Sequence, residues 1–337
     1  MADAITKNLQ NEEDIFRICQ SAFGEAKVPV HIRELTDGFC NAAYDITLND
    51  GRSAILKVAP LSDVKMMSCE VELMAAEVGA MKLAARSGIK GVPKVYFYDD
   101  SREICNSAYF LMEKLDGVSY ASVREHLSES EAAWINFQTG EYLRSLHEIK
   151  GRQFGHFCRK ELQRENWFDA FELLLGRIVK DGMDAHIEIG VPYEDIQDLL
   201  VKHKAYFEEV REASLLHWDS WDGNIFVKDG KLVGLIDWER SMWGDPLMED
   251  RFRFHTVNQD FLKGYGYRDS QGDVVELSHA EQIRCKWYDV YLYLIMMFEV
   301  FYRQYATQDQ YEWVKGMFLP IWEELRQETV GDAGKEV

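Results

Sequence analysis

Apolar and polar residues follow two different periods along this chain. Residues 11–23 carry apolar side chains at helical spacing, so the sequence predicts a helix there. Five strand-like runs follow, and some of them alternate with a period of two residues. The predicted strands are 30–35, 43–48, 54–58, 92–98 and 108–115. An Asn49-Asp50-Gly51 turn joins the second strand to the third, as in a tight hairpin.

Helical periodicity dominates after Asp116, and one earlier helix is predicted over residues 64–86. The predicted later helices are 131–147, 167–179, 196–210, 281–305 and 311–326. One short hairpin lies among them, with strands 225–227 and 232–236. This order predicts an α+β fold with two lobes. Residues 1–115 would form a small antiparallel-sheet lobe with one long helix, 116–330 a mainly helical lobe, and 331–337 a tail.

Length and charge narrow the possible partners. The 337 residues suit two lobes better than one core. Acidic residues outnumber basic ones by 58 to 38, which argues against nucleic acid and anionic membranes as partners, because both recruit lysine and arginine clusters. The most apolar run, 290–298, is too short to span a bilayer. Six scattered cysteines without a CxxC pair indicate buried free thiols and a cytoplasmic protein, whereas oligomeric state is not indicated.

The strongest chemical signal is the segment HWDSWDGN, residues 217–224, which fits the phosphotransfer-loop pattern H-x-D-x-x-x-x-N. In that pattern Asp219 is a base that takes the proton of an acceptor hydroxyl. Asn224 and Asp237, which ends the next predicted strand, offer oxygen ligands for Mg²⁺. An isolated H-x-D triplet usually marks only a capped turn. The full series of loop, hairpin and aspartate is far less common by chance, and it predicts a kinase.

A lysine in the third predicted strand is the candidate for nucleotide binding. Lys57 lies among apolar residues, so its ammonium group requires a carboxylate partner or a phosphate. Glu77 in the following predicted helix is the preferred partner, and Glu70 and Glu72 remain alternatives because the helix is long. A lysine extending from an edge strand to solvent is the structural alternative. The presence of the phosphotransfer loop downstream favours the nucleotide role.

The predicted boundary between the lobes is the expected place for the adenine. There the backbone groups of Glu113 and Leu115 would bind the base, so the side chains carry little information. A loop that covers the phosphates is expected between the first two strands. It contains only Gly38 where protein kinases have a G-x-G-x-x-G motif, so this segment alone would pass for a generic hairpin.

Residues 36–250 resemble the aminoglycoside phosphotransferase and choline kinase superfamily, small-molecule relatives of the protein kinases. The matching features are Gly38 with Asn41, Lys57, Glu77, VPKV at 92–95, Leu146-His147, HWDSWDGN at 217–224, IDWE at 236–239 and GDP at 244–246. The resemblance implies a bilobal protein-kinase-like fold and magnesium-dependent transfer from ATP or GTP. It also implies that Asp219 is the base, that Asn224 and Asp237 bind Mg²⁺, and that Lys57 contacts the nucleotide phosphates.

The sequence departs from the family pattern at two positions and leaves a third open. Cys40 stands where the family loop commonly has serine, which weakens the case for a side-chain contact to phosphate. Trp218 stands where a small glycine is usual, so the local packing must differ. In the GDP motif, Asp245 and Pro246 also fit a helix N-cap and first helical residue, and we favour that structural role for Asp245.

The acceptor cannot be read directly from the sequence. The acidic helical lobe favours a cationic acceptor such as an aminoglycoside, with Glu239, Asp289 and Glu299 as candidate ligands. Internal ion pairs of these carboxylates with arginines such as Arg284 or Arg303 are the alternative.

Other readings of the function also remain open. Trp221 matches the HxDxWxGN form of fructosamine-type kinases, which keeps a sugar-amine or another metabolite possible as substrate. Trp221, Trp238 and Trp243 all lie close to the catalytic segment in sequence, and core packing is the default expectation for each. A nucleotide-binding module without catalysis is a further alternative, although the retained base and metal ligands argue against it.

Overall fold

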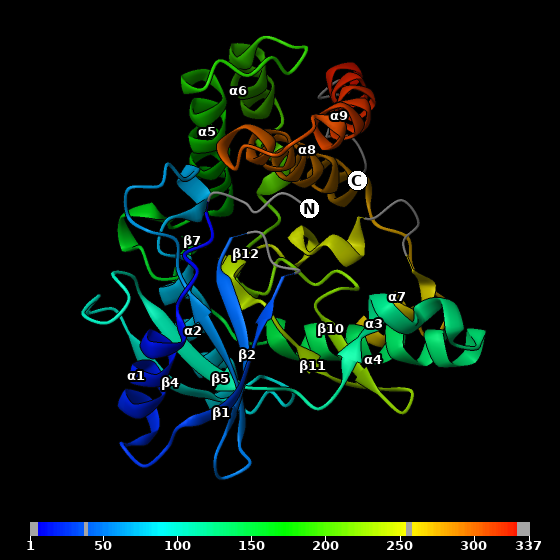
Figure 1. Ribbon diagram of the computed structural model, residues 1–337. Coiled ribbons are helices and arrows are strands. Elements are labelled where there is room, and N and C mark those ends of the chain that lie inside the picture. Colours follow the sequence, from blue (N-terminus) through cyan, green and yellow to red (C-terminus); the bar gives the residue numbers. More distant parts are fainter. Residues whose placement is uncertain (1–5, 37–39, 254–257, 329–337) are drawn as a thin grey trace. The chain divides into compact units, whose positions relative to one another are not determined.

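The computed structural model describes residues 6–36, 40–253 and 258–328. The chain forms two compact units, each made of three separate stretches (Figure 1). We call the first the sheet unit, with stretches Met1–Met66, Glu72–Ile135 and Ser220–Arg240. The second, the helical unit, has stretches Met67–Val71, Asn136–Asp219 and Ser241–Val337. The tail expected at 331–337 lies outside the described residues.

All five predicted N-terminal strands are present and form one antiparallel sheet in the order β1-β2-β3-β5-β4. Their bounds are Pro29–Leu35 for β1, Ala42–Leu48 for β2, Ser53–Val58 for β3, Val95–Asp99 for β4 and Tyr109–Glu113 for β5. The predicted hairpin turn joins β2 to β3, where Gly51 has a positive φ of 84°. The helix expected at the N-terminus is α1, Glu12–Phe23, and the Asn11 side chain caps it.

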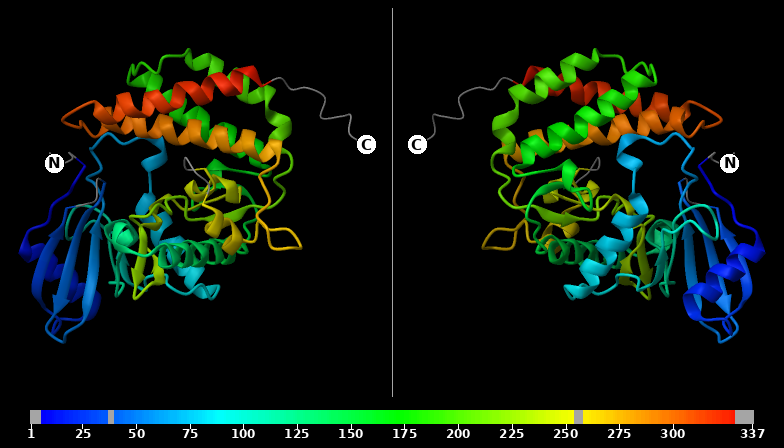
Figure 2. Two further views of the ribbon diagram at one scale, coloured as in Figure 1. Left: turned by 90° about the vertical axis from the view of Figure 1, so that its right-hand side faces the viewer. Right: turned by 90° about the vertical axis from the view of Figure 1, so that its left-hand side faces the viewer.

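Successive side chains of β3 point to opposite faces of the sheet. Leu56 and Val58 point into a core that also holds Ile15 and Ile18 of α1, so this helix covers one face of the sheet (Figure 2). Lys57 lies between them in sequence and therefore points to the opposite face. The strand geometry thus directs the lysine away from the apolar core.

The helix predicted over residues 64–86 is shorter than expected, and this prediction was wrong at its N-terminal end. Helix α2 covers only Leu73–Arg86, and a single turn, η1, covers Ser68–Glu70. Between them Glu72 takes a left-handed conformation, with φ at 61°. The reason is that Met67–Val71 belong to the helical unit, so the chain leaves the sheet unit for five residues before α2 begins.

A second, smaller sheet completes the sheet unit, in the strand order β11-β10-β6. The remaining elements of the unit are β6 (Val118–Ser119), α3 (Tyr120–Val123), η2 (Arg124–His126), β10 (Ile225–Lys228), β11 (Lys231–Leu235) and η5 (Trp238–Arg240). The predicted hairpin is present, and its turn residues Asp229 and Gly230 both have positive φ, 50° and 68°. Gly234 of β11 lies so close to Gly91 that an added Cβ would be 1.9 Å from the Gly91 carbonyl oxygen.

The helical unit contains the long helices expected after residue 130. They are α4 (Glu129–His147, which begins in the sheet unit), α5 (Trp167–Asp184), α6 (Tyr193–Lys202), α8 (His279–Tyr302) and α9 (Asp309–Gln327). The short helix α7 (Gln259–Tyr265) was not predicted from the sequence. Helices α8 and α9 lie side by side (Figure 2). The helix predicted over 196–210 ends at Lys202 and continues only as the turn η4, Lys204–Phe207. Buried aromatic rings of α5 and α8, including Trp167, Phe171 and Tyr288, pack together in its core.

A four-stranded sheet in the order β8-β7-β12-β9 contains the strand that leads directly into residues 217–224. The strands are β7 (Phe154–His156), β8 (Gln163–Arg164), β9 (Ser214–Leu216) and β12 (Met242–Gly244), and short turns are η3 (Lys160–Leu162), η6 (Pro246–Met248) and η7 (Asp250–Phe252). Asp245 caps η6 by accepting the Leu247 N–H, with Pro246 as the first helical residue, so the predicted cap is confirmed. Strands of two or three residues are too short for periodicity to predict.

Two further expectations concern cysteines and membrane spans. All six cysteines are free thiols, and four of them are buried. Cys158 is exposed and Cys69 is half-buried, so only part of the set matches the expectation of buried thiols. No helix in the described part of the chain is long and apolar enough to cross a bilayer.

Candidate active site

Lys57 lies at the centre of a buried charge cluster in the sheet unit. Its Nζ atom is 2.6 Å from Oε1 of Glu77 on α2 and 2.7 Å from Oδ1 of Asp237, which follows β11. The pairing of Lys57 with Glu77, rather than with Glu70 or Glu72, is the one preferred from the sequence. Glu77 is fully buried, whereas the Asp237 side chain remains 34% exposed. Asp237 is therefore the member of this cluster that a ligand can most easily reach.

Glu239 adds a third carboxylate to this cluster. Oxygen atoms of Glu77, Asp237 and Glu239 all lie within 4.8 Å of one another. The Asn41 side chain donates a hydrogen bond to Glu239, at 2.7 Å. Glu239 was expected in an acceptor site of the helical lobe, but the structure places it in the sheet unit. Its turn η5 begins directly after Asp237, so the two carboxylates lie two residues apart in the chain.

The protonation of this cluster reflects three acidic groups around one cation. Burial lowers the pKa of Lys57, but the charges of Asp237 and Glu77 outweigh that effect and hold its pKa above the ordinary value. Burial and the nearby charge of Asp237 raise the pKa of Glu239 to about 8. Burial likewise raises the pKa of Glu77, against the lowering effect of Lys57. A single ammonium group thus does not neutralise the carboxylates, and a further cation would stabilise their charged forms.

The donor set of the cluster fits a hard divalent cation. Carboxylate and amide oxygens are the ligands that Mg²⁺ prefers, and three carboxylates with one lysine leave an excess of negative charge. Of the two predicted magnesium ligands, Asn224 and Asp237, it is Asp237 that belongs to this cluster. The other two carboxylates, Glu77 and Glu239, were not predicted as metal ligands. Asn224 is buried in the same unit, and its carbonyl oxygen accepts the Ile236 N–H at 3.0 Å. That bond ties the end of the loop to the strand that delivers Asp237.

The sheet unit also holds the second half of the catalytic segment in place. The Asp222 carbonyl oxygen accepts a hydrogen bond from the Ala121 N–H at 3.0 Å, and its carboxylate pairs with Arg124 at 2.7 Å. The Asn224 N–H donates to the Trp221 carbonyl oxygen at 2.9 Å. The short segment around α3 and η2 therefore fixes the backbone that presents Asn224.

The first half of the segment belongs to the helical unit and is fixed by Glu249. This buried carboxylate accepts the backbone N–H of His217 at 2.7 Å and that of Trp218 at 3.0 Å. Asp219 follows directly and is half-buried, and its N–H donates to Nδ1 of His217 at 3.3 Å. Glu249 thus holds the two peptide groups that precede the proposed base.

The backbone conformation of Trp218 is one that favours glycine, the residue that was expected at this position. Its φ is 58°, in the left-handed region that non-glycine residues adopt at a cost of about 1–2 kcal/mol. Two interactions offset that cost. The backbone N–H donates to both oxygens of Glu249, and the buried indole packs on Tyr291, with ring centroids 5.3 Å apart.

A chain of hydrogen bonds continues from Glu249 into the helical unit. The Nε2 atom of His147 lies 3.5 Å from Oε1 of Glu249, and the Nδ1 atom of His147 lies 2.8 Å from the Tyr265 hydroxyl. Burial alone would raise the pKa of Glu249, but the contacts with His147 and with the N–H of Trp218 lower it to about 2. Glu249 was not predicted from the sequence. The available signal was a glutamate directly after Leu247 and Met248 in an apolar turn.

The structure describes both residues whose backbones were predicted to bind the adenine, Glu113 and Leu115. The Glu113 N–H donates to the Lys94 carbonyl oxygen at 2.8 Å, so a contact with a base would have to use the Glu113 carbonyl. Leu115 lies just beyond β5, and its carbonyl oxygen accepts the Gly117 N–H at 3.1 Å. Gly38 of the expected phosphate loop lies outside the described residues.

Two of the predicted acceptor ligands have arginine partners inside the helical unit. Asp289 pairs with Arg253, not with the Arg284 suggested from the sequence, and Arg284 instead pairs with Asp245 at 2.9 Å. Glu299 pairs with Arg303 at 3.1 Å, as the alternative interpretation expected. The charges of Asp289 and Glu299 are therefore compensated within the fold, and we do not propose either residue as an acceptor ligand.

The three tryptophans near the catalytic segment have different surroundings. Trp238 is fully buried and Trp243 stacks on Phe157, with centroids 5.6 Å apart, so both pack as expected by default. Trp221 is 51% exposed. Its ring lies over Gly223, where an added Cβ would be 2.1 Å from the ring, so the glycine makes room for this orientation.

Comparison with solved structures shows the fold. The structure matches that of a thermostable variant of the aminoglycoside phosphotransferase APH(4)-Ia bound to AMP-PNP and hygromycin B, with a TM-score of 0.62 and 17% identity over 94% of this chain and 100% of that one. It also matches a candidate fructosamine-3-kinase from Thermobifida fusca, with a TM-score of 0.67 and 16% identity over 93% and 99%. These similarities show a bilobal protein-kinase-like α+β fold.

The sequence itself assigns the family. Residues 31–249 match the model of the APH phosphotransferase enzyme family, and the chain belongs to that family. Members of that family are phosphotransferase enzymes. An aminoglycoside 3'-phosphotransferase from Enterococcus faecalis is 28% identical over 169 residues, which cover 50% of this chain and 60% of the relative. The alignment thus spans less than two thirds of that relative's length.

Proposed function

We propose that this protein transfers the γ-phosphoryl group of ATP, or of GTP, to a hydroxyl of a small cationic molecule in the cytoplasm. The observation that carries the proposal is the buried cluster of Lys57, Glu77, Asp237 and Glu239. Its three carboxylates exceed the charge of its single lysine, as a site for metal and nucleotide phosphates requires.

Within that proposal each residue has a separate task. Lys57 positions the nucleotide phosphates, and Glu77 holds the lysine in place through their 2.6 Å contact. Asp237 and Asn224 bind Mg²⁺, and Glu239 is added to this set on the basis of its position. When bound, Mg²⁺ would neutralise charge on the phosphates. Asn41, Gly38 and the backbones of Glu113 and Leu115 complete the proposed nucleotide site.

Asp219 is the proposed base. Its carboxylate would orient the acceptor hydroxyl and take up its proton as the oxygen attacks the phosphorus atom. The support lies in how its backbone is held, because Glu249 fixes the two preceding N–H groups. A base must stay within hydrogen-bond distance of the reacting oxygen, and a small displacement lowers the reaction rate strongly.

The acceptor is proposed to be cationic because the chain carries a net charge of −20, of which most lies beyond residue 115. Aminoglycosides fit this description. The exposed Trp221 ring in a fructosamine-kinase-like loop specifically favours a second candidate, a sugar-amine adduct, since an exposed indole can stack on a sugar face.

ADP release with a panel of aminoglycosides, choline-like amines, fructosamines and neutral sugars tests the proposal. We expect turnover with a cationic acceptor that depends on Mg²⁺. Asp219→Asn should lower the rate by roughly 10²–10⁴-fold with nucleotide affinity unchanged, because it removes only the base. Turnover confined to neutral or anionic acceptors would overturn the cationic assignment. Nucleotide binding without turnover on any acceptor would indicate a non-catalytic module.

A further inference from the structure

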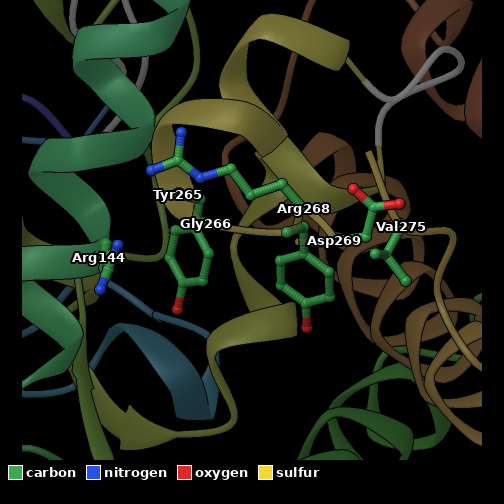
Figure 3. A pocket seen from close by; sticks show the side chains of 7 residues that line it. Arg144, Tyr265, Gly266, Arg268, Asp269 and Val275 are labelled. Carbon is green, nitrogen blue, oxygen red and sulfur yellow. The ribbon is translucent and has the colours of Figure 1, made fainter. Parts of the chain in front are cut away.

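The helical unit contains a pocket that the proposed phosphotransfer reaction does not use. Its volume is about 580 Å³. It is lined by Arg144, Tyr265, Gly266, Tyr267, Arg268, Asp269 and Val275 (Figure 3). Arg144 comes from α4, Tyr265 ends α7, and the others follow in the segment between α7 and α8.

Two guanidinium groups give one end of this pocket a positive charge. In Figure 3 the Arg268 side chain extends toward the side on which Arg144 lies, and Asp269 lies at the opposite end. Within the described residues, no carboxylate lies within ion-pair distance of Arg144 or Arg268. Asp269 instead accepts the N–H groups of Gln271 and Asp273 in its own turn. By contrast, the buried Arg253, Arg284 and Arg303 of the same unit all hold carboxylates.

The wall of the pocket is aromatic. The rings of Tyr265 and Tyr267 lie with centroids 5.8 Å apart and planes 33° apart. Their hydroxyls are used in the interior, where Tyr267 donates to Glu281 at 3.0 Å and Tyr265 contacts His147 at 2.8 Å. In Figure 3 the Tyr265 hydroxyl points away from the Arg268 guanidinium group. The rings can therefore present an apolar surface to a planar group next to the two arginines.

Gly266 makes the approach of Arg144 possible. It caps α7 with φ at 105°, a conformation that side chains rarely adopt, and an added Cβ would lie 3.1 Å from Nη1 of Arg144. The Arg144 guanidinium thus lies against backbone that only glycine supplies.

We propose that this pocket binds a phosphate monoester attached to a planar ring. Such an ester carries a charge of about −1.5 to −2 at neutral pH, which matches two guanidinium groups. The tyrosine rings receive the planar part of the ligand.

The pocket is connected to the catalytic segment through side chains of its own unit. Tyr265 contacts His147, His147 contacts Glu249, and Glu249 holds the N–H groups of His217 and Trp218. A ligand on the Tyr265 ring therefore acts on the residues that position Asp219, so occupancy changes turnover. This second part rests on the proposed function, whereas the binding site does not.

Calorimetric titration of the full chain with phenyl phosphate, without nucleotide, tests the site. Phenyl phosphate should bind more tightly than either inorganic phosphate, which lacks the ring, or phenol, which lacks the charge. Arg144→Gln and Arg268→Gln should each weaken its binding about ten-fold, the usual effect of losing one charge-assisted hydrogen bond. Arg211→Gln, at an exposed arginine of the same unit that does not line the pocket, is the matched control. Equal affinity in all three variants, or equal binding of phenol, would overturn the site.

Tyr265→Phe tests the connection separately, because it keeps the ring and removes the hydroxyl that contacts His147. Phenyl phosphate should still bind this variant, but the change of ADP release that it causes in the wild-type protein should disappear. A turnover response that survives in Tyr265→Phe would overturn the connection and leave the binding site standing. If the protein lacks kinase activity altogether, the calorimetric result still decides the site.

Discussion

Glu70 and Arg303 form a buried ion pair at 2.5 Å, although 233 residues separate them in the sequence. Glu70 lies in the five-residue stretch that joins the helical unit between β3 and α2. Backbone contacts extend this attachment, because the Ser68 N–H donates to Asp181 at 2.7 Å and the Ser68 carbonyl accepts from Arg177 at 3.1 Å. Helix α2, which carries Glu77, thus begins three residues after a fixed point in the helical unit.

Arg303→Met should destabilise the fold by about 3–5 kcal/mol, because it leaves Glu70 and Glu299 buried without their cation. Urea denaturation followed by tryptophan fluorescence measures this loss. Arg326→Met is the matched control, since Arg326 pairs with Glu323 on the exposed face of α9 and such pairs contribute at most about 1 kcal/mol. Similar losses in both variants would contradict a structural role for the buried pair.

Trp218→Gly should be destabilising in spite of the favourable backbone change. Glycine relieves about 1–2 kcal/mol of left-handed strain, but the loss of the buried indole from Tyr291 costs about 3–5 kcal/mol. The net loss of unfolding free energy should be about 2 kcal/mol by chemical denaturation. Trp218→Phe keeps the strain and much of the packing, so it provides the comparison. A glycine variant more stable than wild type would show that the ring contributes little.

Magnesium should stabilise the protein more strongly when Lys57 is absent. Lys57→Met removes the ammonium group that contacts Glu77 and Asp237, so the added divalent ion no longer competes with that group. The rise in melting temperature on adding MgCl₂ should therefore be larger than in the wild type. Asp237→Asn should reduce this rise, because it removes the most accessible carboxylate of the cluster. Equal magnesium shifts in all three proteins would place the metal elsewhere.

The carboxylate of Glu249 should contribute to stability in a pH-dependent manner. Its folded pKa, about 2, lies below the ordinary value of 4.5, so the charged form stabilises the fold above pH 4.5. That contribution is lost as the pH falls through about 2. The stability difference between the wild type and Glu249→Gln should be constant above about pH 5 and shrink by about 3 kcal/mol toward pH 2. A difference that does not change with pH would assign the carboxylate a purely steric role.

The sequence predicted the elements whose signal is local. The five strands of the first sheet and the hairpin around Asp229 and Gly230 follow from alternation and turn residues, and the structure contains them all. Lys57 and Glu77 could be paired because a strand and a following helix place one side chain of each on the same face of a sheet. The pairing of a strand residue with a helix residue depends on the periodicity of each element and on the length of the segment between them. Both can be taken from a single sequence.

The predictions that failed depend on contacts between distant residues. The break before α2 follows from Arg303, and the support of the catalytic segment follows from Glu249, neither of which lies near its target in sequence. Asp289 illustrates the same limit, because a buried carboxylate was recognised but Arg253 was not identified as its partner. The sequence showed that the Asp289 carboxylate needs a cationic partner. Which of several arginines becomes that partner depends on the packing of the helices.

Both units are assembled from discontinuous stretches, and this has a consequence for synthesis on the ribosome. The sheet unit is incomplete until Ser220–Arg240 has emerged, including Trp238, which is fully buried on the turn that packs against α2. At about 5–20 residues per second, translation from Ile135 to Arg240 takes roughly 5 to 20 s. During that interval the nascent sheet unit lacks β10, β11 and η5, so part of its apolar surface stays uncovered. The same discontinuity means that a fragment ending at Ile135 cannot reproduce the complete sheet unit.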